Sequence, residues 1–233
     1  CVGWPPMTSS PQPAADVAAL FARPDVVAFE LYGPGNESEL HPDERARIGQ
    51  AGEKRRREFA AGRMCARAAL VELGMASDQP LGSAPDRAPL WPDGVIGSIS
   101  HTDDYCIVVL APADGSDGGI GIDAERFGRV GDHLHRTIFT TAERAWLGRL
   151  PGPERADTAT TLFSGKEAFY KAQHPLTGSW VGFKDVSGRT GADGLILDPA
   201  TDLGALGRLR WPQTVASLRR ERVVVTAVEV RTS

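Results

Sequence analysis

The sequence predicts an α/β (α+β) fold in which a mixed unit of strands and helices occurs twice. Short apolar runs with strand character alternate with helical stretches along the chain. The two halves contain a similar mix of these elements at similar size, which indicates a duplicated unit, although residue-level repetition is weak. With 233 residues, of which 41% are hydrophobic and 24% charged, the chain has material for one large domain or two small ones.

The elements of the first half are predicted from apolar runs, helix-start signals and turn residues. A lead rich in proline and serine, residues 1–12, is expected to be disordered. His41-Pro42 begins a helix, because proline is favoured in the first helical turn. In order, we predict a strand at 26–32, the helix from 41, a long helix at 53–73, a loop at 77–94, and a hairpin of 95–100 and 105–111 with His101 at its tip.

The second half is predicted in the same way. Residues 119–126 (GIGIDAER) indicate a buried strand, in which Gly119 and Gly121 allow close backbone approach. A capping signal, Thr140/Thr141 with Glu143, begins another helix. Because the residue before proline leaves the helical region, His174-Pro175 is expected to end the next helix. That helix is predicted at 158–173, and a final strand at 222–230.

Composition and charge exclude several classes of protein. We find no apolar run long enough for a transmembrane helix, and the first twenty residues do not resemble a secretory signal. Cys1, Cys65 and Cys106 are too scattered for a disulfide framework or a zinc site, which favours the reducing cytoplasm. With a net charge of −4, binding to nucleic acid by bulk charge is not expected.

One stretch of the chain is nevertheless basic. The stretch from Arg45 to Arg67 contains eight Lys or Arg residues and only two Glu residues, which gives it a local charge of +6. A basic patch on an acidic protein favours a single polyanionic ligand over a long nucleic acid. A solvated helix face without a ligand is the alternative, and the charge count alone does not separate the two.

Two carboxylates lie next to each other on the predicted strand 119–126. Side chains alternate across a strand, so Asp123 and Glu125 point the same way and repel each other. A hard divalent cation with oxygen ligands relieves this repulsion. On the helix 158–173, Glu167 and Lys171 are four residues apart and share a face, and Lys166 can reach a neighbouring phosphate. An ordinary surface ion pair is the alternative for Glu167 and Lys171.

Three motifs in this order resemble those of the 4′-phosphopantetheinyl transferases: GSISHTDDY (97–105), GIDAE (121–125) and FSGKEAFYK (163–171). Further segments resemble the enterobactin-synthetase-component-D branch of the Sfp-type class. These are EKRRREFAAGRMCARAAL (53–70), DRAPLWPDG (86–94) and PLTGSWVGF (175–183). The resemblance covers roughly residues 41–186, and its ordered, multi-part nature makes coincidence improbable.

The resemblance implies an enzyme that moves the phosphopantetheine arm of coenzyme A to a serine of an acyl- or peptidyl-carrier protein, releasing 3′,5′-ADP. Mg²⁺, with Mn²⁺ as an alternative, would be held by Asp123, Glu125 and Glu167. The catalytic residues would be Asp123, Glu167 as general base (directly or through a water) and Lys171 at the phosphate or leaving group.

The resemblance also implies which residues hold coenzyme A. Ser100 and His101 match the motif pair that contacts its phosphates. Arg56 and Arg63, seven residues apart, match the basic residues that would hold the 3′-phosphate or adenine end. Arg87 matches a basic residue that precedes a proline. Lys166 and Lys171 complete the set, whereas Lys54, Arg55 and Arg57 have no match and are expected to be solvated or to face the carrier.

The resemblance leads us to expect the fold of this family, with subdomains at 13–114 and 115–233 related by a pseudo-two-fold axis and the coenzyme A site between them. A cytoplasmic monomer that serves siderophore, non-ribosomal peptide or polyketide carriers is predicted, with fatty-acid synthesis left open. Two other functions remain. One is a non-catalytic module of the same fold that binds coenzyme A or the carrier. The other is a Mg²⁺-dependent hydrolase of nucleotide diphosphates.

Overall fold

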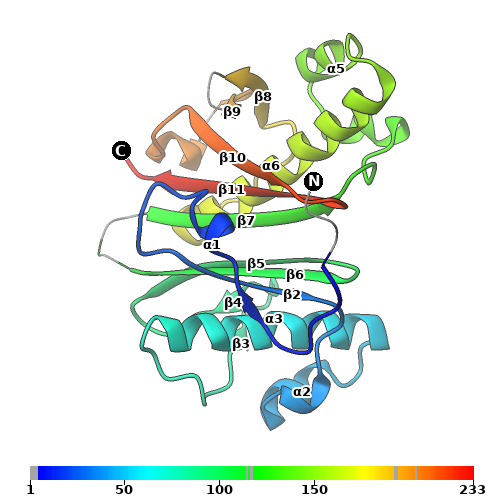
Figure 1. The fold of residues 1–233 in the computed structure, drawn as a ribbon. Helices are drawn as coiled ribbons and strands as arrows, with labels where there is room; N and C mark the ends of the chain where they lie inside the picture. The colour runs from blue at the N-terminus through cyan, green and yellow to red at the C-terminus, as the bar shows by residue number, and fades with distance from the viewer. Residues whose placement is uncertain (1–4, 114, 116–117, 192–193, 203) are drawn as a thin grey trace. The chain divides into compact units, whose positions relative to one another are not determined.

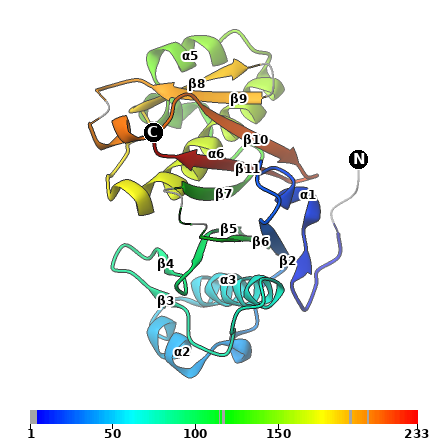
Figure 2. The ribbon, with the colours of Figure 1, turned by 90° about the vertical axis from the view of Figure 1, so that its left-hand side faces the viewer.

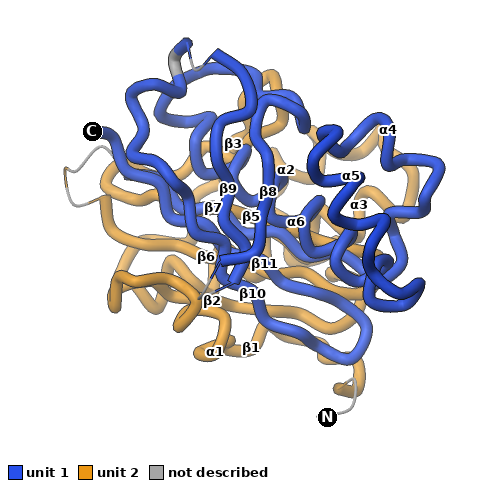
Figure 3. The backbone as a smooth tube through the Cα atoms, turned by 90° about the horizontal axis from the view of Figure 1, so that it is seen from above, with its two compact units in different colours: residues 1–4, 116–233 blue, residues 5–115 orange. Residues whose placement is uncertain are grey.

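The structure, a computed structural model, describes residues 5–113, 115, 118–191, 194–202 and 204–233. The chain forms two compact units (Figure 3). Unit 2 runs from Pro5 to Gly115, and unit 1 contains the chain from Ser116 to Ser233. The predicted pseudo-two-fold relation between the two units stays a prediction.

Unit 2 consists of an antiparallel sheet with one long helix against it (Figure 1). The strand order is β1-β2-β6-β5, and β3 and β4 form a separate small hairpin. The elements are β1 (Gln12–Pro13), α1 (Ala15–Ala18), β2 (Val27–Tyr32), a 3₁₀ turn (Glu37–Glu39), α2 (Pro42–Ile48), α3 (Glu53–Glu72), β3 (Gly82–Ser83), β4 (Pro89–Leu90), β5 (Val95–Thr102) and β6 (Tyr105–Pro112).

Helix α3 is held on this sheet by small and apolar side chains. Cys65, Ala69 and Leu70 are buried in one cluster with Leu31 and Val108 of the strands. Small residues let the helix backbone approach the sheet closely, so the apolar side chains of both layers leave water.

Two predictions for unit 2 need correction. Strand β5 continues to Thr102, so His101 lies within the strand, paired with Cys106, and not at the hairpin tip. The predicted loop 77–94 contains the short strands β3 and β4. Of the lead predicted to be disordered, residues 1–4 lie outside the described residues, whereas Thr8 exchanges hydrogen bonds with Tyr32 at 2.7 and 3.2 Å.

Unit 1 repeats this plan with a larger antiparallel sheet, β7-β11-β10-β9-β8, and one long helix, α6, against β7 and β11 (Figure 2). The elements are β7 (Gly118–Arg126), a 3₁₀ turn (Asp132–Leu134), α4 (His135–Ile138), α5 (Thr141–Leu147), α6 (Gly152–Thr177), β8 (Val186–Gly191), β9 (Gly194–Pro199), a second 3₁₀ turn (Gly204–Arg208), β10 (Gln213–Arg219) and β11 (Val223–Arg231).

Helix α6 is longer at both ends than the sequence predicts. It begins at Gly152 because Pro151 is its N-cap and Pro153 fits the first turn, where backbone N–H groups have no helical partner. The end predicted at His174-Pro175 is wrong: α6 continues to Thr177, and Gly178 caps it with a left-handed φ of 62°. Packing of the helix on β7 and β11 outweighs the hydrogen bond that Pro175 cannot donate.

The fold class predicted from the sequence, mixed α and β with two similar units, is confirmed. Among the residues that the structure describes, no helix combines the length and the hydrophobicity needed to cross a membrane.

Candidate active site

The strand with the two carboxylates lies directly against α6. At Gly121 a Cβ atom would be 1.9 Å from the carbonyl oxygen of Ala168, and at Gly119 it would be 2.2 Å from that of Ala172. No side chain fits at either position, so the predicted close approach is confirmed. Because of this approach, the carboxylates of β7 and the polar side chains of α6 share one region.

Asp123 is the buried centre of this region, with 4% of its surface exposed. Lys171 donates a 2.7 Å hydrogen bond to its Oδ1, and the Ser164 hydroxyl donates one of 2.8 Å to its Oδ2. The Lys171 ammonium also contacts the carbonyl of Ile122 at 3.2 Å. Asp123 therefore forms an ion pair across β7 and α6 whose position is fixed by Ser164 and by Thr226 of β11, 2.8 Å from that hydroxyl.

Two further carboxylates in this region are difficult to ionise. Burial, reinforced by the charge of Asp123, raises the pKa of Glu125 to about 7. Burial and Asp123 also raise the pKa of Glu167, against the opposing effect of Lys171. Carboxylates that repel one another in a partly dry site bind a divalent cation favourably, because the cation replaces repulsion by attraction.

The chemistry of Asp123, Glu125 and Glu167 thus fits the predicted magnesium ion. Within the described ranges, no group of three or more His, Cys, Asp or Glu side chains is placed to hold a metal ion as the side chains stand. One oxygen of Asp123 is bonded to Lys171 instead. The metal ligands predicted from the resemblance therefore stay a prediction that rests on donor chemistry.

Lys166 is placed differently from the sequence expectation. Its side chain is 1% exposed, and the ammonium donates hydrogen bonds to Glu143 at 2.8 Å and to the carbonyl of Phe183 at 2.6 Å. The other oxygen of Glu143 accepts from the backbone N–H of Gly188 at 2.6 Å. This buried pair connects α5, α6 and β8, and its geometry argues against a phosphate contact for Lys166.

Unit 2 contains a basic cavity of about 550 Å³ between α2, α3, the β3–β4 hairpin and β5. Besides cationic residues, its lining includes the apolar side chains of Ile48, Phe59 and Ile99. A ligand with phosphate groups and an aromatic ring matches this combination. The charged and titratable residues that line it are Arg47, Arg55, Glu58, Arg63, Arg87 and His101.

Arg63 is the most buried cation of this cavity, with 4% of its surface exposed. Its guanidinium lies over the Phe59 ring at 4.3 Å and donates to Ser83 Oγ at 2.9 Å. Glu44 lies 3.8 Å from Arg63 Nε, which has no hydrogen-bond partner. Burial lowers the pKa of Arg63 to about 10 although Glu44 opposes the shift. A buried guanidinium with a spare donor is suited to bind an anion.

The structure does not bring all predicted arginines together. Arg56 does not line the cavity, because its guanidinium pairs with Glu37 at 2.8 Å and donates to the carbonyl of Ala51 at 2.7 Å. Arg55 lines the cavity in its place and contacts His101 Nε2 at 2.9 Å. The spacing of Arg55, Phe59 and Arg63, four residues each, is the sequence signal for this face.

Arg87 and Ser100 complete the predicted set. Arg87 lines the cavity from the turn of the β3–β4 hairpin, where it has a left-handed φ of 73°. Its backbone N–H donates to the carbonyl of Ala84 at 2.9 Å. Ser100 is buried in β5, with 5% exposed, and does not line the cavity. Arg47, from α2, is a further lining residue that the sequence reasoning missed.

Two family models match the chain. Residues 43–111 match the 4′-phosphopantetheinyl transferase N-terminal domain, and residues 119–197 match the 4′-phosphopantetheinyl transferase superfamily. The chain is 38% identical over 162 residues to 4′-phosphopantetheinyl transferase Npt of Nocardia iowensis, covering 69% of this chain and 70% of that protein. It is 37% identical over 205 residues to 4′-phosphopantetheinyl transferase Svp of Streptomyces mobaraensis, covering 82% and 78%.

Two other likenesses are less extensive. Enterobactin synthase component D of Salmonella typhimurium is 38% identical over 130 residues, or 54% of this chain and 51% of that protein. A holo-(acyl-carrier-protein) synthase from Bacillus anthracis, solved with coenzyme A (3′,5′-ADP), covers 49% of this chain and 96% of its own at 26% identity, with a TM-score of 0.41. That score is too low to support an argument. The two family models and the relatives from Nocardia and Streptomyces establish that the chain is an enzyme of the 4′-phosphopantetheinyl transferase superfamily.

Proposed function

We propose that this enzyme transfers 4′-phosphopantetheine from coenzyme A to a serine hydroxyl of an apo carrier protein. The Lys171–Asp123 pair, with Glu125 and Glu167 beside it, is the observation that carries the proposal. It combines a cation for a phosphate with carboxylates for a metal ion and for a proton, as transfer of a phosphoryl group requires. The cavity lined by Arg63 would receive the phosphorylated adenosine end of the same substrate.

The reaction moves one proton and exchanges one P–O bond for another. The serine oxygen forms a bond to the β-phosphorus, while the bond from that phosphorus to the bridging oxygen breaks. The electron pair of the broken bond leaves with 3′,5′-ADP. Glu167 takes the serine proton, directly or through a water. Lys171 stabilises charge on the phosphates or leaving group.

Magnesium, held by Asp123, Glu125 and Glu167, would neutralise charge on the pyrophosphate. Side chains of this protein orient the Asp123 carboxylate. Lys171 orients Asp123 through their 2.7 Å hydrogen bond, and Ser164 fixes the other oxygen of the same carboxylate. The Asp123 carboxylate thus enters the reaction in a defined orientation.

Carrier domains of siderophore, non-ribosomal peptide or polyketide assembly are the proposed acceptors. The relative named enterobactin synthase component D supports the first of these. We place the reaction in the cytoplasm and expect a monomer.

The test is the intact mass of an apo peptidyl-carrier protein after incubation with the enzyme, coenzyme A and Mg²⁺. We expect a gain of one phosphopantetheine, which EDTA or Asp123→Ala abolishes. Glu167→Gln, which keeps the volume and loses the charge, is expected to lower the transfer rate at least roughly 100-fold without unfolding the protein. Near-normal turnover of Glu167→Gln would exclude Glu167 as base and ligand.

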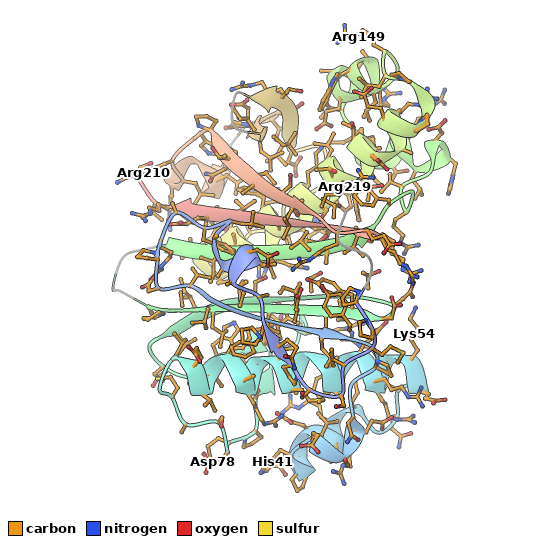
Figure 4. The ribbon with its side chains drawn as sticks, viewed as in Figure 1. His41, Lys54, Asp78, Arg149, Arg210 and Arg219 are labelled. Carbon is orange, nitrogen blue, oxygen red and sulfur yellow. The ribbon has the colours of Figure 1, made fainter. Side chains whose placement is uncertain are left out.

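Two controls separate the alternatives. 3′,5′-ADP released from coenzyme A without any carrier would indicate a hydrolase instead. Tight binding of coenzyme A without a mass gain on several carriers would indicate a non-catalytic module. Arg149→Ala, at an exposed residue outside the proposed machinery (labelled in Figure 4), is a suitable control for preparation quality.

A further inference from the structure

One side chain of the basic cavity has the wrong charge for a polyanionic ligand. Glu58 of α3 lines the cavity next to Arg55 and His101, and 14% of its side chain is exposed. A carboxylate repels a phosphate bound close by and weakens its binding.

The hydrogen bond from Arg55 fixes the protonation of His101. Arg55 Nη1 lies 2.9 Å from His101 Nε2. A guanidinium has donors only, so Nε2 accepts and the imidazole is neutral, with its proton on Nδ1. Nδ1 lies 3.7 Å from Glu58 Oε2. The ring is thus placed between a cation at one nitrogen and a carboxylate at the other.

Two cations lie close to the Glu58 carboxylate. Besides His101, it lies 3.9 Å from Lys54 Nζ and 3.8 Å from Arg55 Nη1. Lys54, labelled in Figure 4, also donates a 2.7 Å hydrogen bond to Asp103. A second cavity of unit 2, of about 370 Å³, also has His101 and Glu58 in its lining. The other charged residues that line the two cavities are Arg47, Arg63 and Arg87 in the first and Glu53 and Arg57 in the second.

We propose that Glu58 is a positioning residue that couples binding of coenzyme A to uptake of one proton by His101. The inference rests on the proposed function, which supplies the ligand. A phosphate that enters the cavity draws Arg55 away from Nε2, because a guanidinium fork fits phosphate oxygens. Nε2 then takes a proton from water and donates it in a hydrogen bond to the phosphate.

Glu58 determines how firmly this proton is held. The imidazolium carries its second N–H at Nδ1, beside the carboxylate, so the new charge is compensated on both sides of the ring. Without Glu58 the ring would lack the stabilisation that this carboxylate provides and would lose the proton at lower pH. The coupling follows from linkage, because the slope of log Kd against pH equals the number of protons taken up.

The test is calorimetric titration of the enzyme with coenzyme A, without Mg²⁺, in buffers of different ionisation enthalpy at pH 7.5 to 8. At this pH a free imidazole is mostly neutral and ligand phosphates are fully ionised. We expect about 0.7 to 1 proton per coenzyme A for the native enzyme, and less than half of that for Glu58→Gln. His101→Asn shows which part of the uptake belongs to the imidazole.

The pH dependence of affinity gives a second readout. The ratio of Kd between Glu58→Gln and native enzyme is expected to grow at least about threefold from pH 6 to pH 8. Removal of a repelling charge or a loosened helix would change Kd by the same factor at every pH. Glu72→Gln, at an exposed residue of the same helix, is the matched control and should retain the full uptake.

The outcomes separate the two proposals. If native enzyme binds coenzyme A without proton uptake, or if Glu58→Gln keeps the full uptake, the coupling is wrong while the transferase function stands. If coenzyme A does not bind, the proposed function fails and the coupling fails with it. Should Glu58→Gln unfold, Glu58→Asp, which keeps the charge, must retain the uptake for the proposal to hold.

Discussion

The ionised carboxylate of Glu125 lowers the free energy of unfolding of the protein. Its pKa in the folded protein, about 7, lies above the ordinary value of 4.5. Between these pH values the folded chain holds a proton that the unfolded chain has released. The ionised carboxylate therefore lowers the free energy of unfolding progressively from pH 4.5 to 7 and fully above pH 7.

We predict that Glu125→Gln stabilises the protein in EDTA at pH 8 by about 1–3 kcal/mol, because the amide is neutral. At pH 4.5 the two proteins should differ little, since native Glu125 is then protonated. Urea unfolding at both pH values measures this. An equal gain at both would mean that the charge of Glu125 is not the cause. Transfer activity of the variant should be lost despite its higher stability.

Arg87 combines a strained backbone with a position in the basic cavity. A left-handed conformation costs a non-glycine residue roughly 1 kcal/mol. We predict that Arg87→Gly unfolds at a higher urea concentration while its KM for coenzyme A rises several-fold. Arg87→Asn should raise KM equally, since it also removes the charge, with a smaller gain in stability. An unchanged KM in both variants would remove Arg87 from the ligand site.

At the scale of elements, the contact of β7 with α6 carries the arrangement of Asp123 and Lys171. We predict that Gly121→Ala lowers the free energy of unfolding by about 1–3 kcal/mol or more, because its Cβ would meet the Ala168 carbonyl at 1.9 Å. Transfer should fall as well, since the helix must shift. The control is Gly152→Ala in α6, because a Cβ atom at Gly152 would meet no other atom within 4 Å. Urea unfolding and the carrier assay report both effects.

The elements were predicted well where local sequence decides them. The strand at 26–32, the helix at 53–73 and the final strand 222–230 agree with β2, α3 and β11 within about one residue, because periodicity and turn residues are local signals. The end of α6 was missed because contacts with β7 and β11 outweigh the local effect of Pro175. A proline rule contains no information about such packing.

For the candidate site, the sequence predicted some side chains better than others, because local spacing does not reveal partners that are distant in sequence. Asp123, Glu167 and Lys171 were identified by spacing within one strand and one helix. Arg56 was preferred to Arg55, although only Glu37 and Ala51 decide where the Arg56 guanidinium goes. Lys166 was assigned to a ligand because nothing in its neighbourhood predicts the buried Glu143, 23 residues earlier. Partners distant in sequence determine the direction of a long side chain.

At the scale of the whole molecule, ligand binding should appear as stability. Coenzyme A at a hundred times its Kd stabilises the folded enzyme by about 2.7 kcal/mol through mass action. We predict that dephospho-coenzyme A reaches this effect only at higher concentration, because it lacks the 3′-phosphate for Arg63. In Arg63→Ala the two ligands should become nearly equivalent. Thermal unfolding with ligand titration tests this, and a preserved preference would place the 3′-phosphate elsewhere.

The pairing of β7 with β11 has a consequence for the order in which the enzyme becomes active on the ribosome. Asp123 of β7 is in register with Thr226 of β11, about a hundred residues later in the chain. The hydroxyl that fixes Ser164 beside Asp123 is therefore synthesised long after Asp123 itself. Long-range pairing of this kind delays folding. A nascent chain that stops before β11 would expose the carboxylates without their support, so activity should be absent until nearly all of unit 1 has emerged.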